Sequence, residues 1–120
     1  MTKEEILSLK AGRELNIKIA EEVMGHKFVQ DETLGDMENH GQSVYGLLQP
    51  YSEDIAAAWL VLEKLKSHHP RIEFNSYNER WEASFSAPDA EFTYPVASAS
   101  TAPEAICKAA LLALLEAKGK

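Results

Sequence analysis

The stretch RIEFNSYNERWEASF, residues 71–85, decides the fold class. Apolar and polar side chains alternate in residues 71–76, and the alternation returns in residues 80–85, where Trp81 is the first large apolar residue. Period-two alternation is typical of strands that bury one face. The polar residues between the two runs favour a turn. The stretch therefore predicts an antiparallel β-hairpin.

A third strand is expected at residues 91–97, where the alternation is repeated after a turn at residues 87–89. Pro95 lies within this strand. Because proline cannot donate a hydrogen bond to the sheet, the strand is expected at a sheet edge or with a bulge. The three strands together predict a three-stranded antiparallel meander.

A helix rich in Ala and Leu is predicted after the meander. Thr101 and Glu104 have the spacing of a capping box, and residues 105–117 are mostly strong helix formers. Leu112 and its neighbours provide more apolar surface than one sheet face needs. This excess favours either a subunit contact or a second layer formed by N-terminal helices.

Helices are also predicted before the meander. Residues 51–68 form the clearest one, with Ser52 as its N-cap and Trp59 in the stripe that faces the core. A capping box at Thr2 begins a short helix, and residues 13–24 have the apolar spacing of a second.

The segment after the second helix has the weakest pattern. Gly25 lies where a left-handed C-terminal cap belongs, and residues 27–29 are compatible with a short strand. Residues 31–46 are expected to be an irregular surface segment. The predicted fold is a single α+β domain spanning residues 1–120. Its N-terminal helices, long helix, three-stranded meander and C-terminal helix are expected to pack as an α/β/α sandwich.

Composition limits the classes of function. The chain has 120 residues, and its 19 acidic and 12 basic side chains give a formal charge of −7. This charge opposes binding to DNA, to RNA or to an anionic membrane. Cys107 is the only cysteine, which favours a reducing compartment. With no secretion signal at the N-terminus, a cytoplasmic location is expected.

Neither catalysis nor metal binding is expected from the motifs. The sequence has no glycine-framed serine and no phosphate-binding glycine loop. The acids of residues 31–38 lack the spacing of a calcium loop, so they are expected to be solvated. The histidines lack zinc-site spacing and are predicted to be solvated or at helix ends: His26, His40, His68 and His69. We therefore expect a non-enzymatic protein with no metal and no cofactor.

Four residues are candidates for ligand binding. Trp81 is either a core residue or a platform on which a nucleobase stacks. Arg80 beside it, Lys27 after the second helix and Lys108 in the last helix could contact phosphate groups. Each base considered alone is more often simply solvated.

Three stretches of the chain together resemble one family. They are residues 4–25, which contain EEIL, GREL and AEEVMG; residues 51–59, YSEDIAAAW; and residues 101–111, TAPEAICKAAL. They are similar to phage ABA sandwich domain proteins, which are small soluble products of phages and prophages.

The resemblance implies a function. The nearest functional analogue is the first type of Thoeris anti-defence protein. Such a protein is a sponge that binds the cyclic ADP-ribose signal of a host TIR enzyme without cleaving it. Related proteins sequester cyclic oligonucleotides, and they form homo-oligomers up to hexamers. The resemblance thus implies a cyclic nucleotide ligand, a homo-oligomer and action in the cytoplasm of an infected bacterium.

The resemblance also assigns roles to residues. Trp81 is similar to the aromatic residue that stacks on adenine, and Lys27 and Lys108 are similar to basic residues that hold the pyrophosphate. Arginine is more frequent in the family at the position of Lys108, and Leu112 stands where a second base is expected. Because lysine lacks the bidentate fork of arginine, weaker pyrophosphate binding is expected. The alternative is a phage protein–protein interaction module without a small ligand.

Overall fold

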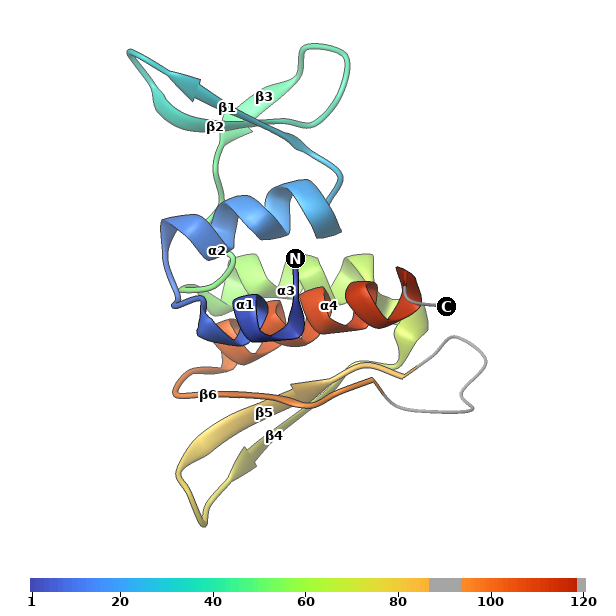
Figure 1. The fold of residues 1–120 in the computed structure, drawn as a ribbon. Helices are drawn as coiled ribbons and strands as arrows, with labels where there is room; N and C mark the ends of the chain where they lie inside the picture. The colour runs from blue at the N-terminus through green and yellow to red at the C-terminus, as the bar shows by residue number, and fades with distance from the viewer. Residues whose placement is uncertain (87–93, 119–120) are drawn as a thin grey trace.

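The computed structural model describes residues 1–86 and 94–118 (Figure 1). The predicted turn at residues 87–89 and the start of the third predicted strand, residues 91–93, lie outside the described residues. In chain order the elements are α1 (Lys3–Ser8), α2 (Arg13–Lys18), the π-helix η1 (Ile19–Val23), β1 (Lys27–Asp31), β2 (Gly35–Asn39), β3 (Tyr45–Leu47), α3 (Ile55–Lys64), the 3-10 helix η2 (Lys66–His68), β4 (Arg71–Asn75), β5 (Arg80–Ser84), β6 (Ala97–Ala99) and α4 (Ala102–Lys118).

The helices lie between two antiparallel sheets (Figure 1). One sheet has the order β1-β2-β3 and the other has the order β4-β5-β6. The predicted α+β class and the meander that contributes β4, β5 and β6 are confirmed. The structure adds a second sheet beyond the N-terminal helices. No helix among the described residues has the length and apolar character needed to cross a membrane.

The N-terminal helices begin and end at the predicted signals. Thr2 forms a complete capping box with Glu5 at the start of α1. The second helix runs through α2 and η1, and its apolar stripe is buried, Val23 included. Gly25 follows with a φ of 73°, a left-handed conformation that costs glycine little.

The expectation of an irregular surface segment at residues 31–46 is wrong, because most of it forms a hairpin. Asp31 Oδ1 accepts hydrogen bonds from the backbone N–H groups of Thr33 and Leu34, each at 2.8 Å. These bonds hold the pKa of Asp31 below its ordinary value. Gly35, with a φ of 88°, closes the turn, and Asp31 pairs with it in register. The short strand expected at residues 27–29 is confirmed as part of β1.

The predicted helix at residues 51–68 begins later than expected. Its N-cap is Asp54, whose side chain accepts a hydrogen bond from the N–H of Ala57. Ser52, the expected cap, is instead buried and donates through its backbone N–H and its hydroxyl to Asn16 Oδ1, at 2.8 and 2.6 Å. This pair fastens α2 to the segment that leads into α3.

The predicted core position of Trp59 is wrong, because its side chain is 58% exposed. Helix α3 packs against α4 rather than directly on the sheet. The face that α3 buries consists of residues smaller than Trp59. Those buried residues are Ala57, Ala58, Val61, Leu62 and Leu65.

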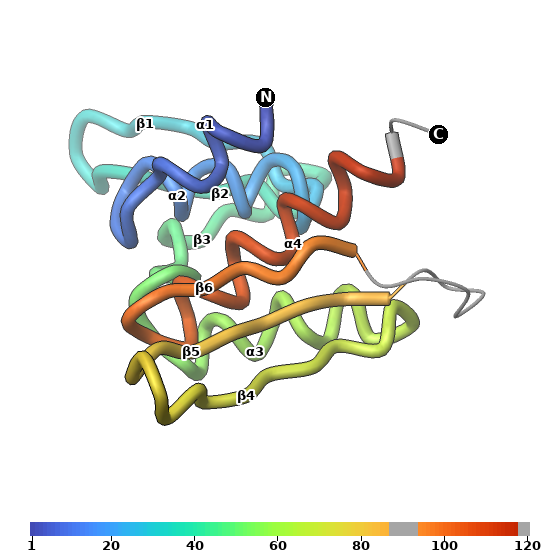
Figure 2. Tube along the Cα trace, turned by 60° about the horizontal axis from the view of Figure 1, so that its bottom comes forward, coloured from blue at the N-terminus to red at the C-terminus, as the bar shows by residue number. Residues whose placement is uncertain are grey.

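Strand β4 pairs with β5, and β5 pairs with β6, so β4 and β6 are edge strands (Figure 2). The edge position expected from Pro95 is confirmed, but β6 begins only at Ala97, and Val96 is exposed. Ile72 and Phe74 share a face with Ala83 and are much more exposed than it is.

Helix α4 is the centre of the molecule. Thr101 Oγ1 accepts a hydrogen bond from the N–H of Glu104, as the capping box predicts. Residues 105–113 are all buried, because α4 packs on β5 and β6 on one side and on α1, η1 and α3 on the others. The apolar excess around Leu112 is therefore covered by the N-terminal helices, which form the expected second layer.

Candidate functional site

Trp81 lies on the face of β5 that the helices cover, and its side chain is only partly buried. The ring packs against the hydrophobic core and makes an edge contact with Phe74, with the ring centroids 5.3 Å apart. Phe74 itself is 50% exposed. The two rings thus combine a fixed position with access to solvent, which is the geometry that a stacking platform needs.

Arg80 lies on the opposite face of β5, because neighbouring residues of a strand alternate in direction. Its guanidinium donates to the side chain and to the carbonyl of Ser98, at 2.9 and 3.2 Å. Arg80 is exposed. Its contacts tie β5 to the edge strand β6 and leave the other side of the guanidinium in solvent.

The two lysines have different environments. Lys27 begins β1 and is exposed on the sheet that lies across the helices from Trp81 (Figure 1). Lys108 is only 6% exposed. Its Nζ donates to the carbonyl of Leu7 at 3.1 Å and pairs with Glu104 Oε2 at 3.0 Å. The charge of Lys108 is therefore satisfied inside the chain, where it joins α1 to α4.

A single chain does not bring the four predicted residues into one pocket. Trp81 and Arg80 point to opposite faces of one sheet, Lys27 belongs to the other sheet, and Lys108 is enclosed between helices. Leu112 is fully buried as well.

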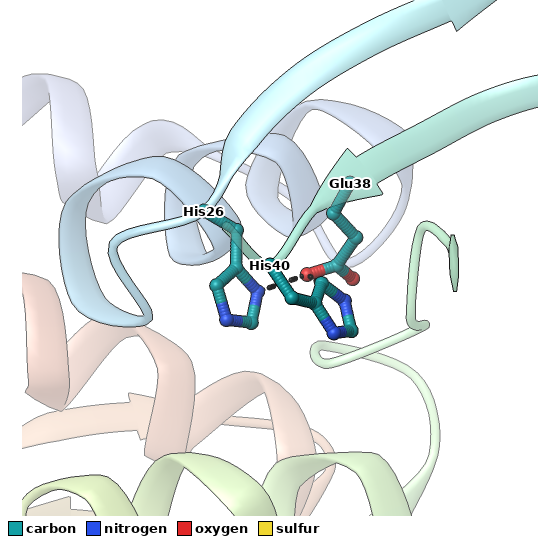
Figure 3. A group of neighbouring side chains, drawn as sticks. All are labelled: His26, Glu38 and His40. Atoms are coloured by element: carbon teal, nitrogen blue, oxygen red, sulfur yellow. Dashed lines mark hydrogen bonds and ion pairs between the residues drawn. The ribbon is translucent and has the colours of Figure 1, made fainter. Parts of the chain in front are cut away.

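The structure brings together a different group, His26, Glu38 and His40, which we call the His–Glu–His cluster (Figure 3). His26 follows Gly25, and its backbone N–H donates to the carbonyl of Ala20 at 2.8 Å, which fixes the chain where β1 starts. Glu38 lies on β2 and His40 follows that strand, so the two share one face. The hairpin therefore carries all three side chains to the same point beneath the sheet.

Glu38 is fully buried and its carboxylate is completely bonded. Oε1 lies 2.6 Å from His26 Nδ1 and accepts from the Tyr51 hydroxyl at 2.7 Å. Oε2 accepts from the backbone N–H of Gln49 at 2.7 Å. A buried carboxylate needs such partners, since its desolvation is unfavourable. Glu38 thereby joins β2 to the segment before α3.

The two imidazole rings of the cluster are stacked, with centroids 4.2 Å apart and an angle of 20° between their planes. His40 Nε2 lies 3.8 Å from Glu38 Oε1, and the His40 side chain is 40% exposed. One buried carboxylate oxygen thus faces two imidazoles, of which one is open to solvent. Such a group can share a proton or ligate a metal ion.

The sequence predicts that His26 and His40 are solvated or at helix ends and that Glu38 is solvated. That expectation is wrong for Glu38, and His26 is mostly buried. The signal that could have found the cluster is the i, i+2 spacing of Glu38 and His40, which places them on one face of a strand. It carries meaning only once residues 35–39 are recognised as a strand.

Burial raises the pKa values of two further groups. Tyr51 is buried and bonded to the Glu38 carboxylate, and both effects raise the pKa of its hydroxyl. Burial raises the pKa of the Cys107 thiol, with a smaller effect of Glu104. Both groups are neutral in the folded chain at physiological pH, so Cys107 is expected to be unreactive.

These two pKa shifts predict a loss of stability in alkaline solution. The ordinary pKa values are 9.0 for cysteine and 10.0 for tyrosine, and only the unfolded chain ionises near them. Because the folded chain keeps both protons, raising the pH above these values favours unfolding. The limiting slope is about 1.4 kcal/mol per pH unit for each group.

Denaturant unfolding of the wild-type chain between pH 8 and 10.5 measures this loss. Cys107→Ala should remove the loss of unfolding free energy that begins near pH 9. Tyr51→Phe should remove the loss that begins near pH 10. If both variants keep the full wild-type slope, the account of the two buried groups is wrong.

The chain is a small α+β domain in which helices separate two short antiparallel sheets. A phage protein from Bacillus cereus ATCC 14579, with a crystal structure at 2.0 Å, has the same fold. It is 26% identical, the TM-score is 0.70, and the match covers 91% of this chain and 90% of that one. No curated protein matches the sequence.

Residues 17–111 match the phage ABA sandwich domain family. This match covers more than half of the chain, so the protein belongs to the phage ABA sandwich domain family. The resemblance of its helical stretches to that family is therefore confirmed.

Proposed function

We propose that this phage protein counters host defence by binding a cyclic nucleotide immune signal and holding it intact. The ligand class is a cyclic ADP-ribose isomer or a cyclic oligonucleotide. The protein acts as a sponge rather than as an enzyme, in the cytoplasm of the infected bacterium. Membership of the phage ABA sandwich domain family supports a role in phage infection.

The observation that carries the proposal is the partly exposed pair of Trp81 and Phe74. An indole held by the core on one side and open on another offers an adenine base a flat apolar surface. Stacking of a base on an aromatic side chain contributes about 1–3 kcal/mol. The ring needs little ordering on binding, because its contacts with the core already fix it.

The phosphates of the ligand need cations from a second copy of the chain. Lys27 and Arg80 are exposed, and in a homo-oligomer of up to six copies they can approach the Trp81 of a neighbour. Lys108 can take part only if its pair with Glu104 opens. Lysine and a single arginine give fewer bidentate contacts than two arginines, so modest affinity is expected.

A protein–protein interaction module is the second candidate function. Its support is an apolar strip of exposed side chains on α3 and β4, in which Trp59 and Ile72 line one open hollow. The strip consists of Ile55, Trp59, Ile72 and Phe74. Exposed apolar surface of this kind is typical of protein contacts.

Titration calorimetry with cyclic ADP-ribose isomers and with cyclic di- and trinucleotides tests the proposal. The wild-type chain is expected to bind at least one of them. Trp81→Ala should weaken that binding about 5- to 150-fold, the equivalent of the lost stacking energy. Tyr77→Ala, which removes a fully exposed aromatic ring from the turn before β5, should bind as the wild type does.

Trp81→Phe keeps an aromatic surface and should retain part of the affinity, even where Trp81→Ala fails to fold. Equal affinity in the wild type and Trp81→Ala, with both folded, contradicts the platform. No binding of any of these ligands contradicts the sponge and leaves the interaction module as the better account.

A further inference from the structure

We propose that the His–Glu–His cluster is a binding site for a divalent transition metal ion, with zinc as the preferred ion. His26 Nδ1, Glu38 Oε1 and His40 Nε2 would be the three protein ligands. A fourth position would remain for water or another ligand. This proposal rests on the cluster alone and is independent of the proposed cyclic nucleotide.

The positions of the donor atoms carry the proposal. One ligand atom from each of the three side chains lies within 4.8 Å of the others. Tetrahedral zinc, with bonds of 2.0–2.1 Å, holds its ligand atoms about 3.3 Å apart. The distances to Glu38 Oε1 are 2.6 Å from His26 Nδ1 and 3.8 Å from His40 Nε2, on either side of that value. Because the two rings are stacked with an angle of 20° between their planes, both imidazoles would have to turn until their nitrogens face one ion.

The surroundings of Glu38 are those of a positioned metal ligand. The Tyr51 hydroxyl donates to both carboxylate oxygens, and the Gln49 N–H donates to Oε2. These donors come from outside the cluster and fix the plane of the carboxylate. Outer contacts of this kind orient metal ligands and raise metal affinity. They also remain in place when the ion replaces the proton between His26 and Glu38.

The donor set selects the class of metal. Two imidazole nitrogens and one carboxylate are the ligands of many zinc sites that keep an open position. Calcium and magnesium prefer sites made only of oxygen ligands, so they fit poorly here. Access is available on the side of His40, which is 40% exposed, whereas Glu38 is fully buried.

Absorption spectroscopy with Co²⁺, followed by displacement with Zn²⁺, tests the site in the full chain. The wild type is expected to bind one Co²⁺ with the intense visible bands of tetrahedral coordination, and Zn²⁺ should abolish them. His40→Ala should lower the affinity at least tenfold and lose the bands. His69→Ala, which removes an exposed histidine outside the cluster, should leave both unchanged.

Tyr51→Phe tests the contribution of a residue that supports Glu38 without binding the metal ion itself. It removes the hydroxyl that Tyr51 directs at both Glu38 oxygens, keeps all three proposed metal ligands, and should lower Co²⁺ affinity about 10- to 100-fold. The proposal is overturned if the wild type shows no tetrahedral Co²⁺ spectrum, or if His40→Ala binds the ion as tightly as the wild type does. The cluster would then be a structural ion pair and nothing more.

Discussion

Glu38→Ala is expected to lower the free energy of unfolding by about 3–5 kcal/mol, the usual effect of removing one partner from a buried charged network. The substitution leaves the buried Tyr51 hydroxyl and the partly buried Gln49 N–H without their acceptor. It also removes the link between β2 and the segment before α3. Denaturant unfolding monitored by circular dichroism measures the change.

Glu73→Ala is the matched control, since Glu73 is an exposed acid on an edge strand that pairs with Arg71 at 3.1 Å. It should change the unfolding free energy by less than about 0.5 kcal/mol. Glu38→Gln keeps the shape and one acceptor oxygen, so it should lie between the two. A Glu38→Ala variant as stable as Glu73→Ala would contradict the role given to this carboxylate.

Ile106→Ala is expected to destabilise the chain by about 2–5 kcal/mol, because it opens a cavity in the most buried element. Ile106 is fully buried in α4, between the second sheet and the other helices. The expected loss combines the transfer energy of the deleted carbons with the unfilled space. Denaturant or thermal unfolding measures it.

Ile55→Ala deletes the same atoms at the start of α3, where the side chain is 54% exposed. It should have little effect on stability, since alanine also favours the helix. Equal losses from the two substitutions would mean that α4 is not the central layer of the molecule.

The parts of the fold that could be predicted from the sequence depend on local signals. The capping signals at Thr2 and Thr101 lie within four residues: Thr2 forms the complete box with Glu5, and Thr101 accepts a hydrogen bond from the N–H of Glu104. The alternation in residues 71–85 specifies β4 and β5, but only β5 buries a face against α4, and β4 stays largely exposed at the sheet edge. Gly25 ends a helix because the backbone there has a left-handed conformation, which glycine adopts at little cost.

The parts that could not be predicted depend on distant partners. Strand β2 carries Asp36 and Glu38, and no local pattern explains why an acid is buried there. Glu38 is buried because Tyr51 and Gln49, more than ten residues later, supply its donors. The one local signal was the turn, where Asp31 and Gly35 flank a three-residue loop typical of a hairpin.

The candidate ligand residues show the same division. That Trp81 lies on a strand followed from the alternation, but the partial burial of its ring depends on its contacts with the core and with Phe74. Lys108 was predicted to be available to phosphate, whereas Leu7 and Glu104 enclose its ammonium group. Its nearness to Leu7, 101 residues earlier, has no trace in the local sequence.

The central claim is that the chain captures a cyclic nucleotide and returns it unchanged, and a capture-and-release assay tests this most directly. Cyclic ADP-ribose isomers and cyclic oligonucleotides are each incubated with excess protein, the free ligand is collected by ultrafiltration, and the retained protein is then denatured by heat. The account predicts that one ligand disappears from the filtrate and is recovered after heating with its original mass. Full recovery of every ligand in the first filtrate, or recovery of a cleaved product, would contradict it.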